Sequence, residues 1–283
     1  AELKVTLLQP VRKIRTYQDI ISLSVHDGGI RLINEIELDH YIAGVTDAEA
    51  GTRCTLEFYK VQAILARTFA LAQINKHVNE GFNLCDLVHC QAYHGKPRDI
   101  NVFRAVEATE GLVVVDDNLD LIVAAFHSNS GGQTANSEDV WGGHTSYLRS
   151  IVDTFSRSMP NYSWEKRMPA HEWLSYLRDR HNFPTETDSG RNIALNFRQD
   201  NRKSHMECST VKVPLRSVRQ DLQLRSTFFN VSRLGNDSVV LSGRGYGHGL
   251  GMCQEGAMLM ARRGYSYQQI LDYYYQNIRL IDL

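Results

Sequence analysis

The amino-acid sequence predicts an α+β fold in which short strands and helices surround a groove. Segments rich in Leu, Val and Ile, separated by turn residues, predict strands near the start of the chain. A long segment with apolar residues at helical spacing follows them. Beyond it, strands and helices occur in mixed order, without the strand–helix alternation that a parallel α/β sheet requires.

The first eighty residues contain the clearest elements. Strands are expected at residues 3–8, 20–25 and 30–38. After a break at residues 47–52, apolar residues recur with the period of a helix from about residue 56 to residue 77. Thr55 has the side chain of an N-cap and Gly81 that of a helix end, so we expect this helix to lie between them.

The rest of the chain contains shorter elements and one change in composition. The expected elements are helix 102–109, strands 112–115 and 121–126, helix 170–181, strand 238–242, and helices 253–263 and 266–276. Charged residues become more frequent between about residues 155 and 235. We interpret residues 156–235 as an inserted or variable lobe, flanked by a core in two parts at residues 1–155 and 236–283.

Composition and charge exclude several classes of protein. The 283 residues include 31 Lys and Arg against 32 Asp and Glu, and 42% are hydrophobic. This balance argues against a disordered chain and against a broad nucleic-acid-binding surface. The longest apolar runs, at residues 112–115 and 121–126, are far shorter than the roughly 18–20 residues of a membrane-spanning helix. We therefore expect no transmembrane segment in this chain and no nucleic-acid partner.

The first candidate site is Glu49, in a segment of small residues that we expect to form a turn before the long helix. A carboxyl group acts as a general acid near neutral pH when burial or a nearby like charge raises its pKa, and Asp47 offers such a charge. The alternative is an exposed acid near a helix N-terminus, where the helix dipole favours it. The residues alone favour this alternative.

The second candidate site is a loop dense in cysteine and histidine. Its metal-ligand candidates are His77, Cys85, His89 and Cys90, and His94 follows them. Two thiolates and two imidazoles suit tetrahedral Zn²⁺, and a metal ion would hold together a loop with few apolar residues. The spacing matches no standard zinc finger, and a Cys85–Cys90 disulfide beside surface histidines remains the alternative.

The third candidate segment is GRGYGHGLGMCQEGA at residues 243–257. Its alternating glycines do not form the G-x-G-x-x-G pattern of a dinucleotide-binding loop. We expect them to let the backbone pass close to a neighbour or to an extended ligand. A Cys–His nucleophile pair of His248 and Cys253 would need a third group that orients it, and the sequence identifies none.

Together these segments resemble the stage II sporulation protein D (SpoIID) family of bacterial peptidoglycan lytic transglycosylases. The segments that carry the resemblance occur in family order, at residues 41–49 (YIAGVTDAE), 60–70 (KVQAILARTFA), 83–95 (NLCDLVHCQAYHG), 127–141, 243–257 and 271–275 (LDYYY). They span most of the chain. Residues 1–35 and much of 155–235 do not enter the match.

The resemblance implies a set of site residues. Catalysis would depend on one glutamate, which corresponds to Glu49, and a structural zinc ion would be bound by Cys85, His89 and Cys90, with His77 as fourth ligand. Eight further residues would line or brace a glycan groove: Lys60, Gln62, Arg67, Tyr93, Ser130, Gln133, His248 and Gln254. The family usually has Pro-Ser-Glu-Met where this chain has Asp-Ala-Glu-Ala at residues 47–50.

The function implied is that of a lyase acting on the glycan strands of peptidoglycan, stripped of stem peptides. Glu49 would act first as acid and then as base, closing the muramoyl C6 hydroxyl onto C1 as a 1,6-anhydro ring. Such a protein would be exported, to the periplasm or the cell envelope. Two alternatives are a non-catalytic glycan-binding enhancer of a cell-wall amidase, and a hydrolase that pairs Glu49 with Asp139.

Overall fold

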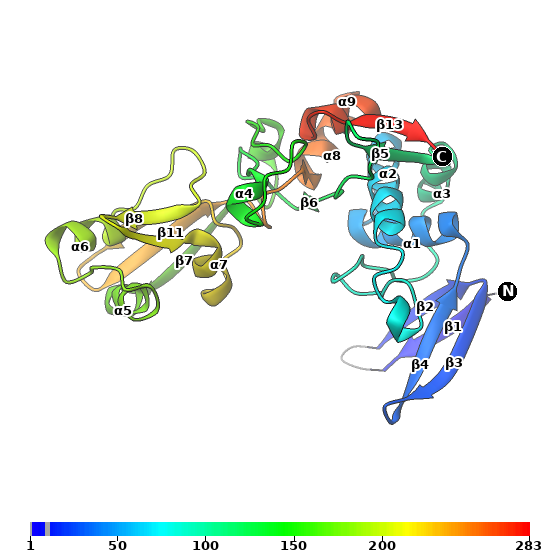
Figure 1. Cartoon of the computed structure of the whole chain (residues 1–283), viewed down its shortest axis with the longest axis horizontal. Coiled ribbons are helices and arrows are strands. Elements are labelled where there is room, and N and C mark those ends of the chain that lie inside the picture. Colours follow the sequence, from blue (N-terminus) through cyan, green and yellow to red (C-terminus); the bar gives the residue numbers. More distant parts are fainter. Residues whose placement is uncertain (1, 9–11) are drawn as a thin grey trace. The chain divides into compact units, whose positions relative to one another are not determined.

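The computed structural model describes residues 2–8 and 12–283, and it confirms the α+β class. The described residues form two compact units. Unit 1 contains the residues up to Ala124 with Ala261–Asp272 and Asn277–Leu283, and unit 2 contains Ala125–Met260 with Tyr273–Gln276. Figure 1 shows the elements of both units with their labels.

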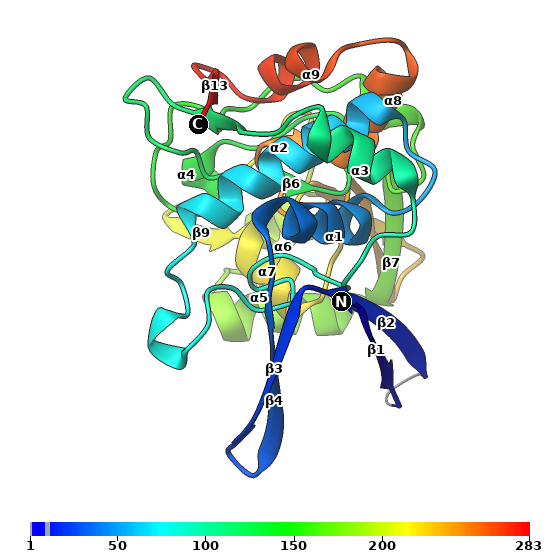
Figure 2. The same cartoon turned by 90° about the vertical axis from the view of Figure 1, so that its right-hand side faces the viewer.

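Unit 1 combines two N-terminal hairpins with a helical part. Its first strands and helices are β1 (Glu2–Leu7), β2 (Lys13–Gln18), β3 (Ile20–His26), β4 (Gly29–Glu35), α1 (Leu38–Ala50), α2 (Leu56–Ala72), the 3-10 helix η1 (Val78–Glu80) and α3 (Ile100–Glu107). Strand β5 (Leu112–Val115) pairs antiparallel with β13 (Arg279–Asp282). The antiparallel hairpins β1–β2 and β3–β4 extend from the helical part of the unit (Figure 2).

Helix α2 is the element that the sequence predicts best. Thr55 caps it as expected, since its side chain accepts a hydrogen bond from the backbone N–H of Phe58 at 3.4 Å. The predicted end is wrong, because α2 stops at Ala72 and Gly81 instead follows η1, with a φ of 86°. The apolar period that we extended to residue 77 continues past the last helical turn into a loop.

Helix α1 was not predicted from the sequence. We expected a strand up to residue 38 and a break at residues 47–52, whereas residues 38–50 are helical. Gly44 and Thr46 have low helix propensity, so local preference does not indicate the helix. Tertiary packing stabilises the helix instead, because the side chains of Ile42 and Val45 are fully buried in unit 1.

The prediction of a strand at residues 121–126 is also wrong. The apolar run at residues 121–126 does not form a continuous strand: Leu121 makes one isolated bridge with Val115. Of the residues in this run, only Phe126 lies in a strand, β6 (Phe126–His127). This strand pairs in parallel with β12 (Met252–Cys253). The side chains of an apolar run can be buried in any extended conformation. Such a run therefore does not by itself specify which strand it pairs with.

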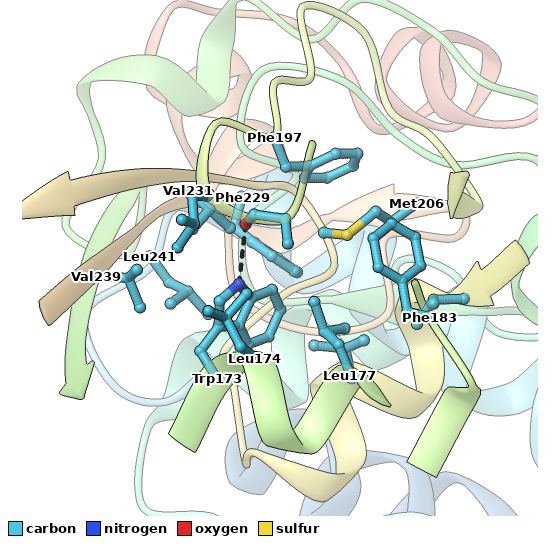
Figure 3. Close-up of a cluster of buried hydrophobic side chains, with 14 of the residues drawn as sticks. Trp173, Leu174, Leu177, Phe183, Phe197, Met206, Phe229, Val231, Val239 and Leu241 are labelled. Atoms are coloured by element: carbon cyan, nitrogen blue, oxygen red, sulfur yellow. Dashed lines mark hydrogen bonds between the residues drawn. The ribbon is translucent and has the colours of Figure 1, made fainter. Parts of the chain in front are cut away.

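Unit 2 has its own hydrophobic core. Its remaining elements are α4 (Ser137–Val140), η2 (Phe155–Ser158), β7 (Ser163–Pro169), α5 (Ala170–His181), α6 (Asp188–Leu195), β8 (His205–Cys208), β9 (Val211–Pro214), α7 (Leu215–Asp221), β10 (Phe229–Leu234) and β11 (Ser238–Arg244). Strands β10, β11 and β7 form an antiparallel sheet in that order. Figure 3 shows Trp173 of α5 in this core, with its indole N–H donating to the Ala194 carbonyl at 2.9 Å.

The last helices are α8 (Gln254–Arg262) and α9 (Tyr267–Tyr274), close to the predicted ranges. The core of unit 2 joins residues from Trp164 to Leu241.

The division of the chain into a core and a lobe at residues 156–235 stays a prediction. None of the helices in the described part of the chain has the length and apolar character that crossing a membrane requires.

Candidate active site and metal-ligand cluster

Glu49 lies in the last turn of α1 and not, as expected, in a turn before the next helix. Its side chain is half-buried, and its Oε1 accepts a hydrogen bond of 2.8 Å from the backbone N–H of Ala92. The two residues are 43 positions apart in the chain. The carboxyl group is therefore bonded to a second segment of the fold. An exposed acid at a helix end, the alternative considered from the sequence, would lack such a bond.

Burial raises the pKa of the Glu49 carboxyl, and the hydrogen bond from Ala92 partly opposes this effect. The charge that we expected from Asp47 is not the cause of this shift. Instead burial, followed by the charge of Asp99, raises the pKa of Asp47 itself. Glu49 thus keeps its proton at a higher pH than an ordinary glutamate does, which is the property required of a general acid.

The four predicted metal ligands lie together. The ligand atoms of His77, Cys85, His89 and Cys90 are all within 4.8 Å of one another. The Cys90 Sγ is 3.4 Å from His77 Nε2, and the Cys85 Sγ is 3.8 Å from His89 Nδ1. All five cysteines of the chain are free, so the alternative of a Cys85–Cys90 disulfide is not what the structure contains.

The surroundings of His77 suit a metal ligand. Its Nδ1 is 2.5 Å from a carboxylate oxygen of Glu80, while its Nε2 faces Cys90. A carboxylate on the second ring nitrogen fixes the orientation of a ligating imidazole and raises its basicity. The Phe82 ring stacks on the His77 ring with centroids 4.8 Å apart. Two thiols and two imidazoles in this arrangement fit a tetrahedral soft cation such as Zn²⁺.

Of the other predicted residues in unit 1, Tyr93 directly follows Ala92, whose N–H is bonded to Glu49. Tyr93 is buried. Lys60 forms an ion pair of 2.7 Å with Glu57 on the same helix, and Gln62 is fully buried in α2. These two side chains belong to the helix that packs against α1.

Arg67 is a brace within unit 1. Its side chain is buried, and the guanidinium donates to the Thr109 carbonyl at 2.7 Å and to the Leu112 carbonyl at 3.2 Å. It also pairs with Asp39 at 2.9 Å. Asp39 is at the opposite end of α1 from Glu49, about 15 Å along the helix axis. Arg67 therefore satisfies carbonyls beyond the end of α3 and ties them to the start of α1.

The other four predicted groove residues belong to unit 2. The buried Ser130 hydroxyl donates to Asp153 at 2.7 Å, and the Gln133 side chain donates to Ser150 at 3.0 Å. His248 accepts a hydrogen bond from the Leu250 N–H, and burial lowers its pKa to about 4, so its ring is neutral at pH 7. Gln254 is half-buried at the start of α8.

The glycine-rich segment passes close to a neighbouring segment, which is one of the two roles we expected. A Cβ at Gly245 would lie 2.6 Å from the Asn129 carbonyl oxygen, and one at Gly247 would lie 2.7 Å from His127. Cys253 is fully buried and burial raises its pKa, so the thiolate needed for a Cys–His nucleophile pair is disfavoured.

The sequence did not reveal the backbone N–H of Ala92 or the helix that carries Glu49. Gly44 offered the one usable signal, because a glycine inside a helix commonly marks a close approach. A Cβ there would lie 2.5 Å from the Gly95 carbonyl oxygen and closer still to the Tyr93 ring. Helix α1 and the loop after Cys90 therefore touch along the backbone.

The fold and the site define an α+β protein with a half-buried acid bonded to the Ala92 N–H, and with a cluster of two cysteines and two histidines that ends at Cys90, two residues before Ala92. Residues 26–115 match the SpoIID family, described as stage II sporulation protein. The resemblance found in the sequence is therefore confirmed for residues 26–115, which are similar to the SpoIID domain. The matched range contains Glu49, Ala92 and the whole metal-ligand cluster.

Similarity to known proteins extends beyond this domain. The chain is 28% identical over 281 residues to an uncharacterised protein of Brachyspira hyodysenteriae, covering 95% of this chain and 73% of that protein. It is 28% identical over 280 residues to stage II sporulation protein D of Bacillus subtilis, covering 92% and 79%. It is 27% identical over 297 residues to the amidase enhancer of Bacillus subtilis, covering 84% of this chain and 40% of that protein.

Proposed function

We propose that this protein is a peptidoglycan lytic transglycosylase that cleaves the linkage between N-acetylmuramic acid and N-acetylglucosamine in peptide-stripped glycan strands. The observation that carries the proposal is the environment of Glu49, a half-buried carboxyl whose pKa is raised by burial. The similarity to stage II sporulation protein D supports a role at the cell wall. We propose accordingly that the protein is exported and acts in the periplasm or cell envelope.

In this mechanism Glu49 transfers one proton in each direction. The protonated carboxyl donates its proton to the glycosidic oxygen, which leaves with the N-acetylglucosamine residue as the C1–O bond breaks. The C6 hydroxyl of the muramoyl residue then attacks C1, and the Glu49 carboxylate takes the hydroxyl proton. A 1,6-anhydro ring forms and the acid is regenerated. No water is consumed, so a second carboxylate to activate water is not required.

The remaining barrier reduction comes from substrate positioning. General acid–base catalysis accounts for roughly 10²–10⁴-fold, so contacts along the strand must supply the rest. We propose roles in binding the glycan strand, or in bracing residues that bind it, for Lys60, Gln62 and Tyr93 of unit 1 and for Ser130, Gln133, His248 and Gln254 of unit 2. The buried Arg67 contributes by holding α1 in place, since its guanidinium is bonded to protein carbonyls and to Asp39.

We propose that His77, Cys85, His89 and Cys90 bind a structural zinc ion. Four protein donors complete a tetrahedral shell and leave no open position for water or substrate. When bound, the ion would cross-link a loop in which Val88 and Leu87 are exposed and which has little core of its own. No step of the reaction passes through it.

A second candidate function is supported by one relative, whose name is amidase enhancer. In this case the chain would bind glycan strands, or a cell-wall amidase, without cutting the strand. This relative is matched over only 40% of its length, so the likeness concerns part of that protein.

The test is digestion of peptide-free glycan strands, with mass spectrometry of the products. We expect 1,6-anhydro ends from the native protein and none from Glu49→Gln, whereas the control Glu107→Gln, at an exposed position of α3, should be fully active. Undiminished turnover by Glu49→Gln would refute the assignment. Intact strands with measurable binding would support the enhancer function, and reducing ends would indicate a hydrolase, with Asp139 as the candidate second acid.

The metal proposal has a separate test. Elemental analysis of the purified protein should find about one zinc ion per chain, and Cys85→Ser or Cys90→Ser should lose it. Val88→Ala, in the same loop but 86% exposed, should retain the metal. A metal-free native protein would contradict the proposal.

A further inference from the structure

The three residues that follow Cys90 are each attached to the helices of unit 1. Gln91 is buried, and its side chain joins two helices: its Nε2 donates to the Ala66 carbonyl of α2 at 3.3 Å, and its Oε1 accepts from the Tyr41 hydroxyl of α1 at 3.3 Å. Ala92 donates its N–H to Glu49. Residues 91–93 are called the bridge below.

Tyr93 fixes the other end of the bridge. Its hydroxyl donates to the Asn34 side chain at 2.8 Å, and its ring lies 5.3 Å from the Tyr41 ring, centroid to centroid. The missing side chain of Gly44 lets α1 approach this ring closely. The N–H between Gln91 and Tyr93 is therefore positioned from both sides, by contacts that do not involve Glu49.

The bridge begins directly after a metal-ligand candidate. Cys90 and Ala92 are two residues apart, which limits their separation to about 7 Å. The loop before the bridge is closed on itself, because the Cys90 N–H donates to the Leu87 carbonyl at 2.9 Å and the Tyr93 N–H to the Asp86 carbonyl at 3.2 Å. Only two peptide bonds separate Cys90 from the residue whose N–H is bonded to Glu49.

We propose that the bridge couples the metal site to the catalytic acid: an ion bound by the cluster fixes the Ala92 N–H against the Glu49 carboxyl, with Gln91 and Tyr93 as positioning residues. This inference rests on the proposed function. The ion then acts on catalysis through the orientation of Glu49. Loss of the ion, or of the Gln91 side chain, lets the Ala92 N–H move away, and the Glu49 carboxyl then loses the hydrogen bond that orients it.

The experiment follows the Ala92 amide by residue-resolved hydrogen exchange, which measures local opening independently of activity. The zinc-loaded protein is compared with the chelator-treated protein and with zinc-loaded Gln91→Ala. We expect the Ala92 amide to exchange at least about tenfold faster in the chelator-treated protein and in Gln91→Ala than in the zinc-loaded native protein. The Val114 amide, which donates to the buried Thr68 hydroxyl at 3.0 Å, should keep its rate and so report that unit 1 remains folded.

Three further variants make the outcome decisive. Glu49→Ala removes the acceptor and should accelerate exchange at Ala92 without loss of zinc. Tyr93→Phe keeps the ring and loses only the bond to Asn34, so its effect should be smaller than that of Gln91→Ala. Val88→Ala should match the native protein. In glycan digestion, Gln91→Ala should lower kcat about tenfold or more while KM stays within about twofold.

Native exchange at Ala92 after metal removal, or equal behaviour of Gln91→Ala and Val88→Ala, would overturn the coupling. Faster exchange of the Val114 amide after chelation would show that unit 1 has unfolded globally. In that case the exchange rates of the Ala92 amide in zinc-loaded Gln91→Ala and Tyr93→Phe test the coupling. These results are distinct from a failure of the proposed function. That failure would appear as full turnover by Glu49→Gln, whatever the exchange rate at Ala92.

Discussion

At the scale of single residues, the protonation of Glu49 is decided by two opposing effects. Removal of the carboxyl from water favours the neutral form, and the Ala92 N–H favours the ionised form. Burial is the larger effect, so the pKa is raised above 4.5. The hydrogen bond from Ala92 stabilises the anion without outweighing burial, which suits a group that must both release a proton and take one back.

This balance predicts the pH dependence of activity. The acid must be protonated at the start of the reaction, so kcat/KM should fall as the pH rises through the raised pKa of Glu49. The folded state also binds this proton more tightly than the unfolded state does. The contribution to stability is therefore present at low pH and is lost as the pH rises through the folded-state pKa. A pH–rate profile checks the prediction, and a falling limb at or below pH 4.5 would contradict it.

At the scale of elements, helix α1 depends on its neighbours. Its residues Gly44 and Thr46 do not favour a helix, and the buried Ile42 and Val45 supply the packing that does. The same glycine allows the backbone of the loop after Cys90 to approach. One position thus weakens the helix locally and makes possible the contact that locates Glu49.

Gly44→Ala tests this interpretation. Alanine would gain up to about 1 kcal/mol of helix propensity, but the added Cβ overlaps the Tyr93 ring and the Gly95 carbonyl. Overpacking costs typically about 1–3 kcal/mol, so we expect a net loss of stability and of activity. Thermal unfolding measures it. Gly143→Ala, where a Cβ meets nothing within 4 Å, is the control and should be neutral. A more stable Gly44→Ala protein would show that the approach is not close.

The loop of the metal-ligand cluster is an element that the sequence described well. The residue types indicated a loop suited to a metal ion and the resemblance indicated four of its side chains, whose ligand atoms the structure brings within 4.8 Å of one another. Their spacing left the disulfide alternative open. Only the folded arrangement, with all the cysteines free, separates the two.

At the scale of the whole molecule, the chain forms two compact units. The core of unit 2 gathers apolar side chains from strands and helices between Trp164 and Leu241, around Trp173 (Figure 3). This unit lies outside the range that matches the SpoIID family. Four of the predicted groove residues, Ser130, Gln133, His248 and Gln254, belong to this unit.

Trp173→Ala tests the core of unit 2. The side chain is fully buried and its indole N–H is bonded to the Ala194 carbonyl. Removing it should cost about 3–5 kcal/mol of unfolding free energy, as large-to-small substitutions of aromatic core residues do. Denaturant unfolding followed by circular dichroism measures the loss. Leu234→Ala, at a 45% exposed position of β10, should stay within about 0.5 kcal/mol of the native protein, and equal effects of the two changes would contradict the assignment.

The sequence by itself determined the α+β class, the start of α2 at its Thr55 cap, and the loop of cysteines and histidines that could hold a metal ion. These follow from side-chain chemistry and from patterns between near neighbours. The tertiary structure alone decided that residues 38–50 are helical and that Glu49 meets the N–H of Ala92, 43 residues away. Burial and contacts between distant segments come from packing, and no local pattern of the chain encodes them.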